Sequence, residues 1–163
     1  MKRFIYILFL LVLIGASMTS CVKEKSFSPI PVIVFKQFIL YNIDSADCII
    51  GFKDGDGDIG VLAGDTVSQS DLIMKYLYKG SAGIFLPYDA TPGTIKFDTL
   101  FYTDRVQYIT PLGKYKALDG EIKMKLRAPP VYNKIHTIIK FDIVLTDRAG
   151  HRSNMVETNE ITP

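Results

Sequence analysis

Apolar and polar residues alternate with a period of two in several parts of this chain, and this pattern restricts the fold more than any other feature. Between Ile139 and Leu145 every odd-numbered residue is apolar, and the even-numbered residues of 122–126 and 48–52 follow the same rule. Successive side chains of a β-strand point to opposite faces, so each stretch can turn one face to a core and the other to water. The pattern predicts antiparallel sheets with one buried face each.

Further strands are expected elsewhere in the chain. Five other stretches have the composition of strands and are bounded by turn-forming residues: 32–40, 72–79, 84–88, 100–109 and 155–161. The run GSAG at 80–83 predicts a hairpin turn between two of them. No stretch of ten or more residues has the period of an amphipathic helix. Seven or eight short strands predict an all-β domain, either a β-sandwich or a closed barrel.

The first twenty residues have the composition of an export signal. Lys2 and Arg3 precede an unbroken run of eleven apolar residues from Phe4 to Ile14. A helix needs about 17 or more apolar residues to cross a bilayer, so this run is too short for a transmembrane span and fits the apolar region of a signal peptide. Residues 1–20 are therefore expected to be removed on export.

The residues that follow resemble the lipobox of bacterial lipoproteins, with Met18, two small residues and then Cys21. The resemblance implies cleavage before Cys21, a diacylglycerol on its sulfur, and a membrane anchor of several acyl chains. Residues 21–31 would then form a lipid-anchored tether, because prolines, serines and charged residues favour an extended, solvated segment. The alternatives are an ordinary secretory signal with a chance cysteine and an uncleaved anchor.

Charge and cysteine content exclude several classes of protein. The chain has 19 basic and 17 acidic residues, and the excess of two lies in Lys2 and Arg3. The remainder is formally neutral and lacks the basic excess of a nucleic-acid-binding protein, so no nucleic acid is expected as a partner. With Cys21 lipidated, Cys48 has no partner for an intramolecular disulfide. Its apolar neighbours predict a small buried residue, and a reactive thiol is the alternative.

A run of aspartates is the one chemical signal in the sequence. Asp54, Asp56 and Asp58 alternate with glycines in KDGDGDIG, directly after a strand of the buried type. Calcium is bound by six to eight oxygen atoms, largely from carboxylates and carbonyls, on a flexible backbone. The run therefore predicts a structural Ca²⁺ site formed by these three residues, with Asp65 as a possible fourth ligand.

The aspartate run is not an EF-hand. Ile59 stands where that loop requires Gly, and Asp65 stands where it requires Glu. The alternative to calcium is a polar loop in which glycines supply positive φ angles and aspartates accept hydrogen bonds in turns.

Several segments resemble a group of functionally uncharacterised Bacteroidota lipoproteins. They are 52–60, with the DGDGDIG motif, 111–122, with the sequence PLGKYKALDGEI, and 146–158. The stretch FDIVLTDRAGHRSNM at 141–155 also resembles the last hairpin of bacterial immunoglobulin-like domains, with His151 where that family usually has Asn. The resemblance implies an antiparallel immunoglobulin-like β-sandwich of seven or eight strands over residues 32–163.

The tether carries a further weak resemblance. Lys23, Glu24 and Lys25 are similar to the short charged signals behind the lipid cysteine in surface lipoproteins of the Bacteroidota. The protein is therefore expected in the cell envelope at the outer membrane, with its leaflet and its periplasmic or surface side left open.

No catalytic motif is present, so a non-catalytic protein is expected. The two histidines, His136 and His151, lie outside any metalloprotease motif and are expected at the surface, and the chain has no GxSxG, Walker or CxxC sequence. A pair of carboxylates for a hydrolase would meet only in three dimensions, so this alternative stays open.

Tyrosines offer one more candidate surface, for a glycan or an envelope protein. The alternative is that they pack across strands with their hydroxyls in water. They are Tyr76, Tyr78, Tyr88, Tyr102, Tyr108, Tyr115 and Tyr132. The function expected from the sequence is a lipid-anchored binding or assembly module of unknown ligand, and the alternative is a purely structural envelope lipoprotein.

Overall fold

Eight strands and no helix make up the part of the chain that the computed structural model describes, which is residues 27–42, 45–66, 71–87, 101–109, 111, 116–127 and 136–162. The strands are β1 (Val32–Asn42), β2 (Ser45–Asp54), β3 (Asp71–Lys79), β4 (Phe85–Pro87), β5 (Phe101–Arg105), β6 (Leu118–Arg127), β7 (Ile139–Leu145) and β8 (Val156–Glu157). The prediction of an all-β chain is confirmed. The predicted signal peptide at residues 1–20, Cys21 and residues 22–26 of the predicted tether lie outside the described residues.

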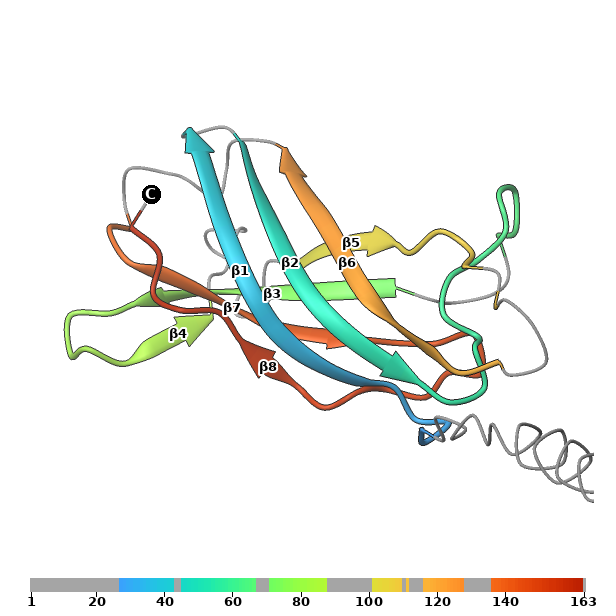
Figure 1. The fold of residues 1–163 in the computed structure, drawn as a ribbon. Coiled ribbons are helices and arrows are strands. Elements are labelled where there is room, and N and C mark those ends of the chain that lie inside the picture. Colours follow the sequence, from blue (N-terminus) through green and yellow to red (C-terminus); the bar gives the residue numbers. More distant parts are fainter. Residues whose placement is uncertain are drawn as a thin grey trace, which may run out of the picture.

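The strands form two antiparallel sheets that pack face to face (Figure 1). One sheet has the order β1-β2-β6, and the other has the order β4-β3-β7-β8, with β5 also paired to β3. Strand β3 pairs with β5 through its first half and with β4 through its last three residues. The two separate sheets make the domain a β-sandwich, so the alternative prediction of a closed barrel is wrong.

The order of the strands is that of an immunoglobulin-like domain. With the short strands β4 and β5 set aside, β1-β2-β6 corresponds to A-B-E of an immunoglobulin-like domain, and β8-β7-β3 corresponds to G-F-C. Strand β4 extends the second sheet beyond β3. The predicted immunoglobulin-like β-sandwich is therefore confirmed.

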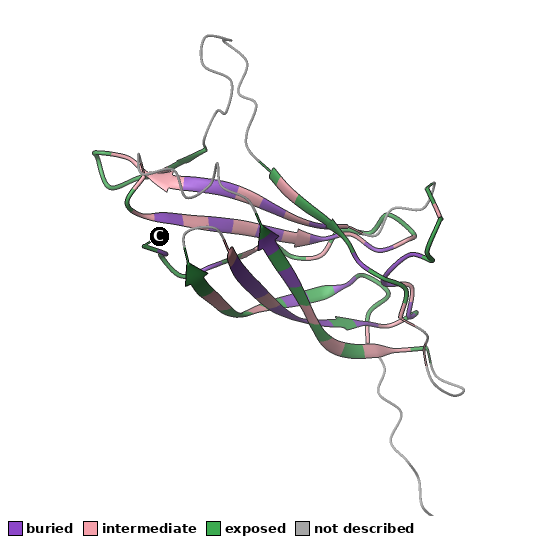
Figure 2. Ribbon diagram, turned by 90° about the horizontal axis from the view of Figure 1, so that it is seen from above, coloured by how far each residue is buried: buried purple, intermediate pink, exposed green. Residues whose placement is uncertain are grey.

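The core follows from the period-two pattern of the strands. Even-numbered residues of β2 and odd-numbered residues of β7 are buried between the sheets, and Figure 2 shows the alternation along the strands. Phe141 lies at the centre, with the rings of Phe38, Tyr76 and Tyr102 between 5.7 and 5.9 Å away. Cys48 is fully buried, and burial raises the pKa of its thiol to about 12, so it acts as a small apolar residue as predicted.

The two predicted hairpins are present. In the 80–83 turn, Gly80 donates to the carbonyl of Ile84 at 2.8 Å. After β7 the backbone N–H of Asp147 donates to the carbonyl of His151, and Thr146 bridges to Arg152. The chain reverses here as the resemblance to immunoglobulin-like domains implies.

Two predicted strands are shorter than expected. The expected strand 100–109 ends at Arg105, because Val106 turns into the core and the next residue bridges to Val61 in parallel. The expected strand 155–161 is reduced to β8, and Ile161 then returns to pair with Ile139. In both segments an apolar side chain beyond the end of the strand, Val106 or Ile161, is buried in the core.

One side chain closes the edge of the three-stranded sheet. Asn154, in the segment before β8, accepts a hydrogen bond from the N–H of Ile33 at 2.8 Å and donates to its carbonyl at 2.9 Å. The amide thus pairs with β1 as another strand would, and it joins the first strand to the final hairpin across the sandwich.

We expect Asn154→Ala to lower the free energy of unfolding by about 1–2 kcal/mol, because the backbone groups of Ile33 lose both partners. Urea unfolding would measure the change. Asn159→Ala, at a nearby exposed position, is the matched control and should stay within about 0.5 kcal/mol of the parent chain. Equal losses in the two variants would contradict the role of Asn154.

Candidate functional site

Asp54 is a buried carboxylate at one end of the sandwich. It is the last residue of β2 and continues the inward face formed by Cys48, Ile50 and Phe52. Its relative exposure is 0%. The same alternation that places apolar side chains in the core therefore carries a charged group inward at the end of the strand.

The loop after β2 folds back over this carboxylate. The backbone N–H of Asp58 donates to Oδ2 of Asp54 at 3.0 Å. Gly57 and Gly60 have φ angles of 71° and 85°, and a Cβ at Gly57 would lie 2.1 Å from the carbonyl oxygen of Lys116. Only glycine fits such positions, so the glycines between the aspartates set the curvature of the loop.

The fold brings the three predicted ligands together. Carboxylate oxygens of Asp54, Asp56 and Asp58 all lie within 4.8 Å of one another. Oδ1 of Asp54 and Oδ1 of Asp58 are both buried, and neither has a hydrogen-bond partner. A buried oxygen without a partner is costly and rare in a native domain.

The electrostatics of the loop reflect this arrangement. The pKa of Asp54 is raised to about 6, chiefly by burial and also by the charges of Asp56 and Asp58, while hydrogen bonds from backbone N–H groups oppose the shift. The pKa of Asp58 is also raised, chiefly by burial and then by the charge of Asp147. The loop thus holds negative charge that its own groups do not compensate.

The turn after β7 packs against the aspartate loop. Asp147 is fully buried and continues the inward face of β7, as Asp54 continues that of β2. Both of its carboxylate oxygens are satisfied, by the backbone N–H of His151 at 2.8 Å and by Nδ1 of the same residue at 2.9 Å. Asp147 and Asp54 therefore occupy similar positions, but only Asp147 has a partner for each oxygen.

Three contacts join the turn to the loop. Ala149 donates its N–H to Oδ2 of Asp58 at 3.0 Å, and the N–H of Arg148 donates to the carbonyl of Asp58 at 3.2 Å. The guanidinium of Arg148 donates to the carbonyl of Gly60 and lies 4.8 Å from the ring centre of Tyr108. Asp147 was not among the predicted site residues, although its place in the odd-numbered series after Leu145 is the signal that indicates its burial.

The donor set suits a hard cation. All three side chains offer carboxylate oxygens, and Ca²⁺ is bound by six to eight oxygens from carboxylates, carbonyls and water. A surface hollow of about 460 Å³, lined in part by Asp56, Asp58 and Arg148, gives water and ions access to the cluster. The loop also has the features of the alternative prediction, a polar loop with positive-φ glycines and an aspartate that accepts a hydrogen bond in a turn. These features do not provide a hydrogen-bond partner for Oδ1 of Asp54 or Oδ1 of Asp58.

Asp65 lies outside the cluster. It belongs to a turn in which its N–H donates to the carbonyl of Leu62, and its own carbonyl accepts a hydrogen bond from Arg105. The EF-hand spacing that suggested Asp65 does not apply, because the chain leaves the loop at Val61 to bridge to Gln107.

The two histidines differ in exposure. His151 is exposed in a turn, as predicted. His136 is half-buried, hydrogen-bonds to the hydroxyl of Tyr76 and stacks on Tyr78 at 4.1 Å, so it is only partly at the surface, where it was expected. Burial lowers the pKa of the His136 imidazole.

The described tyrosines do not gather into one exposed patch. Tyr76 is in the core, Tyr102 packs edge-on against Phe141, and Tyr108 lies under Arg148. Packing is thus their main role in this part of the domain. Tyr88, Tyr115 and Tyr132 lie outside the described residues.

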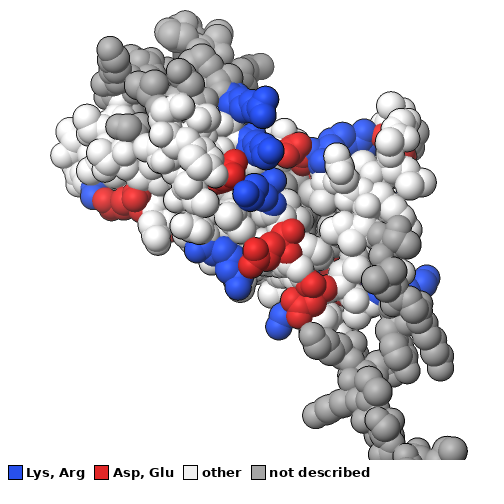
Figure 3. Space-filling model, turned by 45° about the horizontal axis from the view of Figure 1, so that its top comes forward, with Lys and Arg blue, Asp and Glu red and all other residues white. Residues whose placement is uncertain are grey.

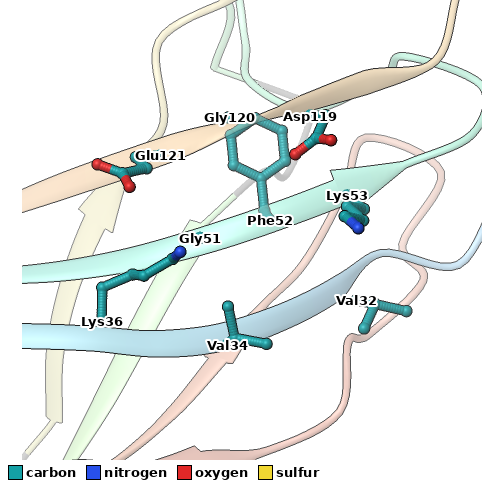
Figure 4. Close-up of a pocket in the computed structure, with 9 residues that line it drawn as sticks. All are labelled: Val32, Val34, Lys36, Gly51, Phe52, Lys53, Asp119, Gly120 and Glu121. Carbon is teal, nitrogen blue, oxygen red and sulfur yellow. The ribbon is translucent and has the colours of Figure 1, made fainter.

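A second hollow lies on the outer face of the three-stranded sheet. Gly51 leaves the middle of this face without a side chain, between Val34 on β1 and Glu121 on β6 (Figure 4). The Lys36 side chain reaches over the floor, and its Cε lies 2.8 Å from the place that a Cβ of Gly51 would take. The hollow holds ordinary surface groups in contact with water, and we assign no ligand to it.

We expect Asp54→Asn to stabilise the cation-free protein at neutral pH. The folded-state pKa of Asp54 is raised from 3.8 to about 6. The stability gained by protonating Asp54 is therefore complete below about pH 4 and is lost as the pH rises through about 6. In EDTA at pH 7.5 the variant should unfold with a free energy about 1–3 kcal/mol higher than the parent chain, and the difference should vanish toward pH 4.

Urea unfolding across this pH range would measure the difference, with Asp104→Asn on the exposed face of β5 as the control. A variant that is less stable than the parent chain at pH 7.5 in EDTA would contradict the assignment of an uncompensated buried charge.

No family model, no curated protein and no solved structure matches this chain. The chemistry of the site is therefore inferred from the described residues themselves.

Proposed function

We propose that this chain is a lipid-anchored module of the cell envelope with a non-catalytic role in binding or assembly, and that a structural Ca²⁺ at Asp54, Asp56 and Asp58 locks its immunoglobulin-like domain. The observation that carries the cation site is the unpartnered, fully buried carboxylate oxygen of Asp54 next to two further carboxylates. A divalent cation would supply the partner that this oxygen lacks and offset the repulsion among three negative charges.

Calcium fits the cluster better than the other common metals. The described histidines and Cys48 make their contacts elsewhere, so the cluster lacks the nitrogen and sulfur ligands typical of zinc. Mg²⁺ prefers a rigid octahedron and retains several waters, whereas Ca²⁺ accepts irregular oxygen sets on flexible loops. Carbonyls of the loop and water would complete the coordination.

The cation would connect the two sheets of the sandwich. Asp54 belongs to β2 of one sheet, and Asp58 contacts Ala149 and Arg148 in the turn that follows β7 of the other. A cation that fixes Asp54 to Asp58 therefore also fixes the position of this turn.

A structural role suits this site better than the alternative of a carboxylate-based hydrolase. Catalytic carboxylates must touch the scissile bond, but Asp54 has no exposed surface. The raised pKa of Asp54 has burial as its main cause and does not by itself indicate a catalytic acid.

The anchor is proposed from the sequence. Residues 1–20 would be the signal peptide, Cys21 the lipidated residue and residues 21–31 the tether, with the outer membrane as destination. Among the described residues no helix is long and apolar enough to cross a membrane. A purely structural envelope lipoprotein without a discrete partner is the second candidate.

Millimolar Ca²⁺ should raise the melting temperature by about 5–10 °C relative to EDTA, because a ligand that binds only the folded state stabilises it. Asp56→Asn should remove most of this response. Asp65→Asn, which lies outside the cluster, is the matched control and should keep it. An unchanged melting temperature, together with no bound metal in native mass spectrometry, would contradict the proposed cation site.

The full chain, expressed in a bacterial host with an alkyne-labelled fatty acid, should incorporate the label and sediment with membranes. Cys21→Ser should lose the label and leave the membrane fraction. Cys48→Ala, the change at the other cysteine, should keep both properties. Labelling that persists in Cys21→Ser would contradict the lipobox.

A further inference from the structure

The outer edge of β6 is a long, regular strand edge. Strand β6 pairs with β2 through ten consecutive residue pairs without a register shift. On its other side, no strand of the described segments pairs with it. Unpaired N–H and C=O groups along such an edge form a template for another strand.

The other sheet edges offer much less. Strands β4 and β8 have three and two residues, and β5 has five. The edge of β1 is already held at Ile33 by the side chain of Asn154. Short strands and capped edges are the usual protection against pairing with another chain. Strand β1 is also long, but its pairing with β2 has two register shifts, so among the described strands β6 has the longest regular open edge.

The outer face of β6 carries charges in an ordered series. Asp119 and Glu121 are followed by three basic residues, Lys123, Lys125 and Arg127, all exposed. Figure 3 shows basic side chains gathered over one part of this face and acidic ones over the adjoining part, and Figure 4 shows the two carboxylates on β6. In an antiparallel pairing of two such strands, the acidic half of each lies against the basic half of the other.

We propose that β6 pairs antiparallel with β6 of a second copy of this chain, around a two-fold axis at Ile122, so that two three-stranded sheets join into one of six strands. Glu121 of each copy then lies opposite Lys123 of the other, and Asp119 lies opposite Lys125. The interface is isologous, with the same surface contributed by both copies.

The side-chain pattern selects this register. Outward residues must lie opposite outward residues, because a shift by one residue would send every apolar side chain to the wrong face. The adjacent allowed registers place Lys123 opposite Lys123 or Glu121 opposite Glu121, and like charges directly opposite are destabilising. Centring on Ile122 is the register in which each of these facing charges meets its opposite.

Contacts within one copy hold the basic half in place. The ammonium of Lys123 lies 3.3 Å from Asp47, which also accepts a hydrogen bond from the hydroxyl of Tyr41 at 2.9 Å. The Lys123 side chain is nevertheless half exposed, so it can also meet a carboxylate of a second copy. The pairing does not depend on the cation site, which lies in the loop beyond β2.

Reversing the charges of Glu121 and Lys123 in the full chain tests the proposed pairing of β6 with β6 of a second copy. The protein is purified in detergent with a large excess of micelles, and sedimentation equilibrium measures its dimerisation. Glu121→Lys alone and Lys123→Glu alone should each raise the dimer dissociation constant about tenfold or more, because a two-fold axis repeats every like-charge contact. The double variant E121K/K123E restores opposite charges and should return to within about threefold of the parent chain. Lys36→Glu, on β1 of the same face, is the control and should leave dimerisation unchanged.

Circular dichroism spectra confirm that each variant is folded before its association is compared. A parent chain that stays monomeric at 100 µM would overturn the proposal, as would a dimer that is indifferent to the single reversals or is not restored in the double variant. Mixed E121K and K123E chains should form heterodimers in preference to either homodimer, and the absence of this preference would also count against the register.

Discussion

The alternation of inward and outward side chains in β2 and β7 continues for one more inward position after the last apolar residue, and in both cases that position holds an aspartate. The contacts between the aspartate loop and the turn after β7 depend on these two buried carboxylates. The alternation carries two fully buried carboxylates inward, Asp54 at the end of β2 and Asp147 two residues beyond the end of β7. A carboxylate in such a position needs a partner for each oxygen. His151 supplies both partners of Asp147 from the same turn. Asp54 accepts hydrogen bonds only from the backbone of its own loop, and its Oδ1 has no hydrogen-bond partner among the described residues.

The two loops that carry these carboxylates are interdependent. The aspartate loop supplies acceptors to Arg148 and Ala149, and the turn after β7 supplies the donors that hold Asp58. The aspartate loop follows β2 of one sheet, and the turn follows β7 of the other, so the contacts between them connect the two sheets at one end of the sandwich. At one side of the sandwich Asn154 has a similar role, because it joins the final hairpin to β1. Polar contacts of this kind fix the relation of the sheets more specifically than apolar packing alone.

Most of the fold could be predicted from the sequence, because alternation is a local signal and the inward faces of β2, β6 and β7 all show it. The grouping of Asp54, Asp56 and Asp58 was also predictable from their spacing. Their relation to the turn that holds Asp147 was not predictable, because the hydrogen bond from Ala149 to Asp58 joins residues 91 positions apart in the chain. Asp65 was placed by analogy with a loop that requires flanking helices, and this chain turns away at Val61. The burial of His136 depends on Tyr76 and Tyr78 of a neighbouring strand, which no local pattern reveals.

The entry of the chain into the domain has a mechanical consequence. The N–H of Gly55 donates to the carbonyl of Ser28 at 2.8 Å, and the ammonium of Lys53 lies over the ring of Phe27 at 5.4 Å. A pull on the chain ahead of Phe27 therefore reaches the aspartate loop and the Asn154 contact at Ile33 before it reaches most of β1. Force directed along β1 then shears its antiparallel pairs with β2 together instead of opening them one after another. Tension on the preceding chain would therefore reach the domain first at this corner, where the aspartate loop meets the first strand.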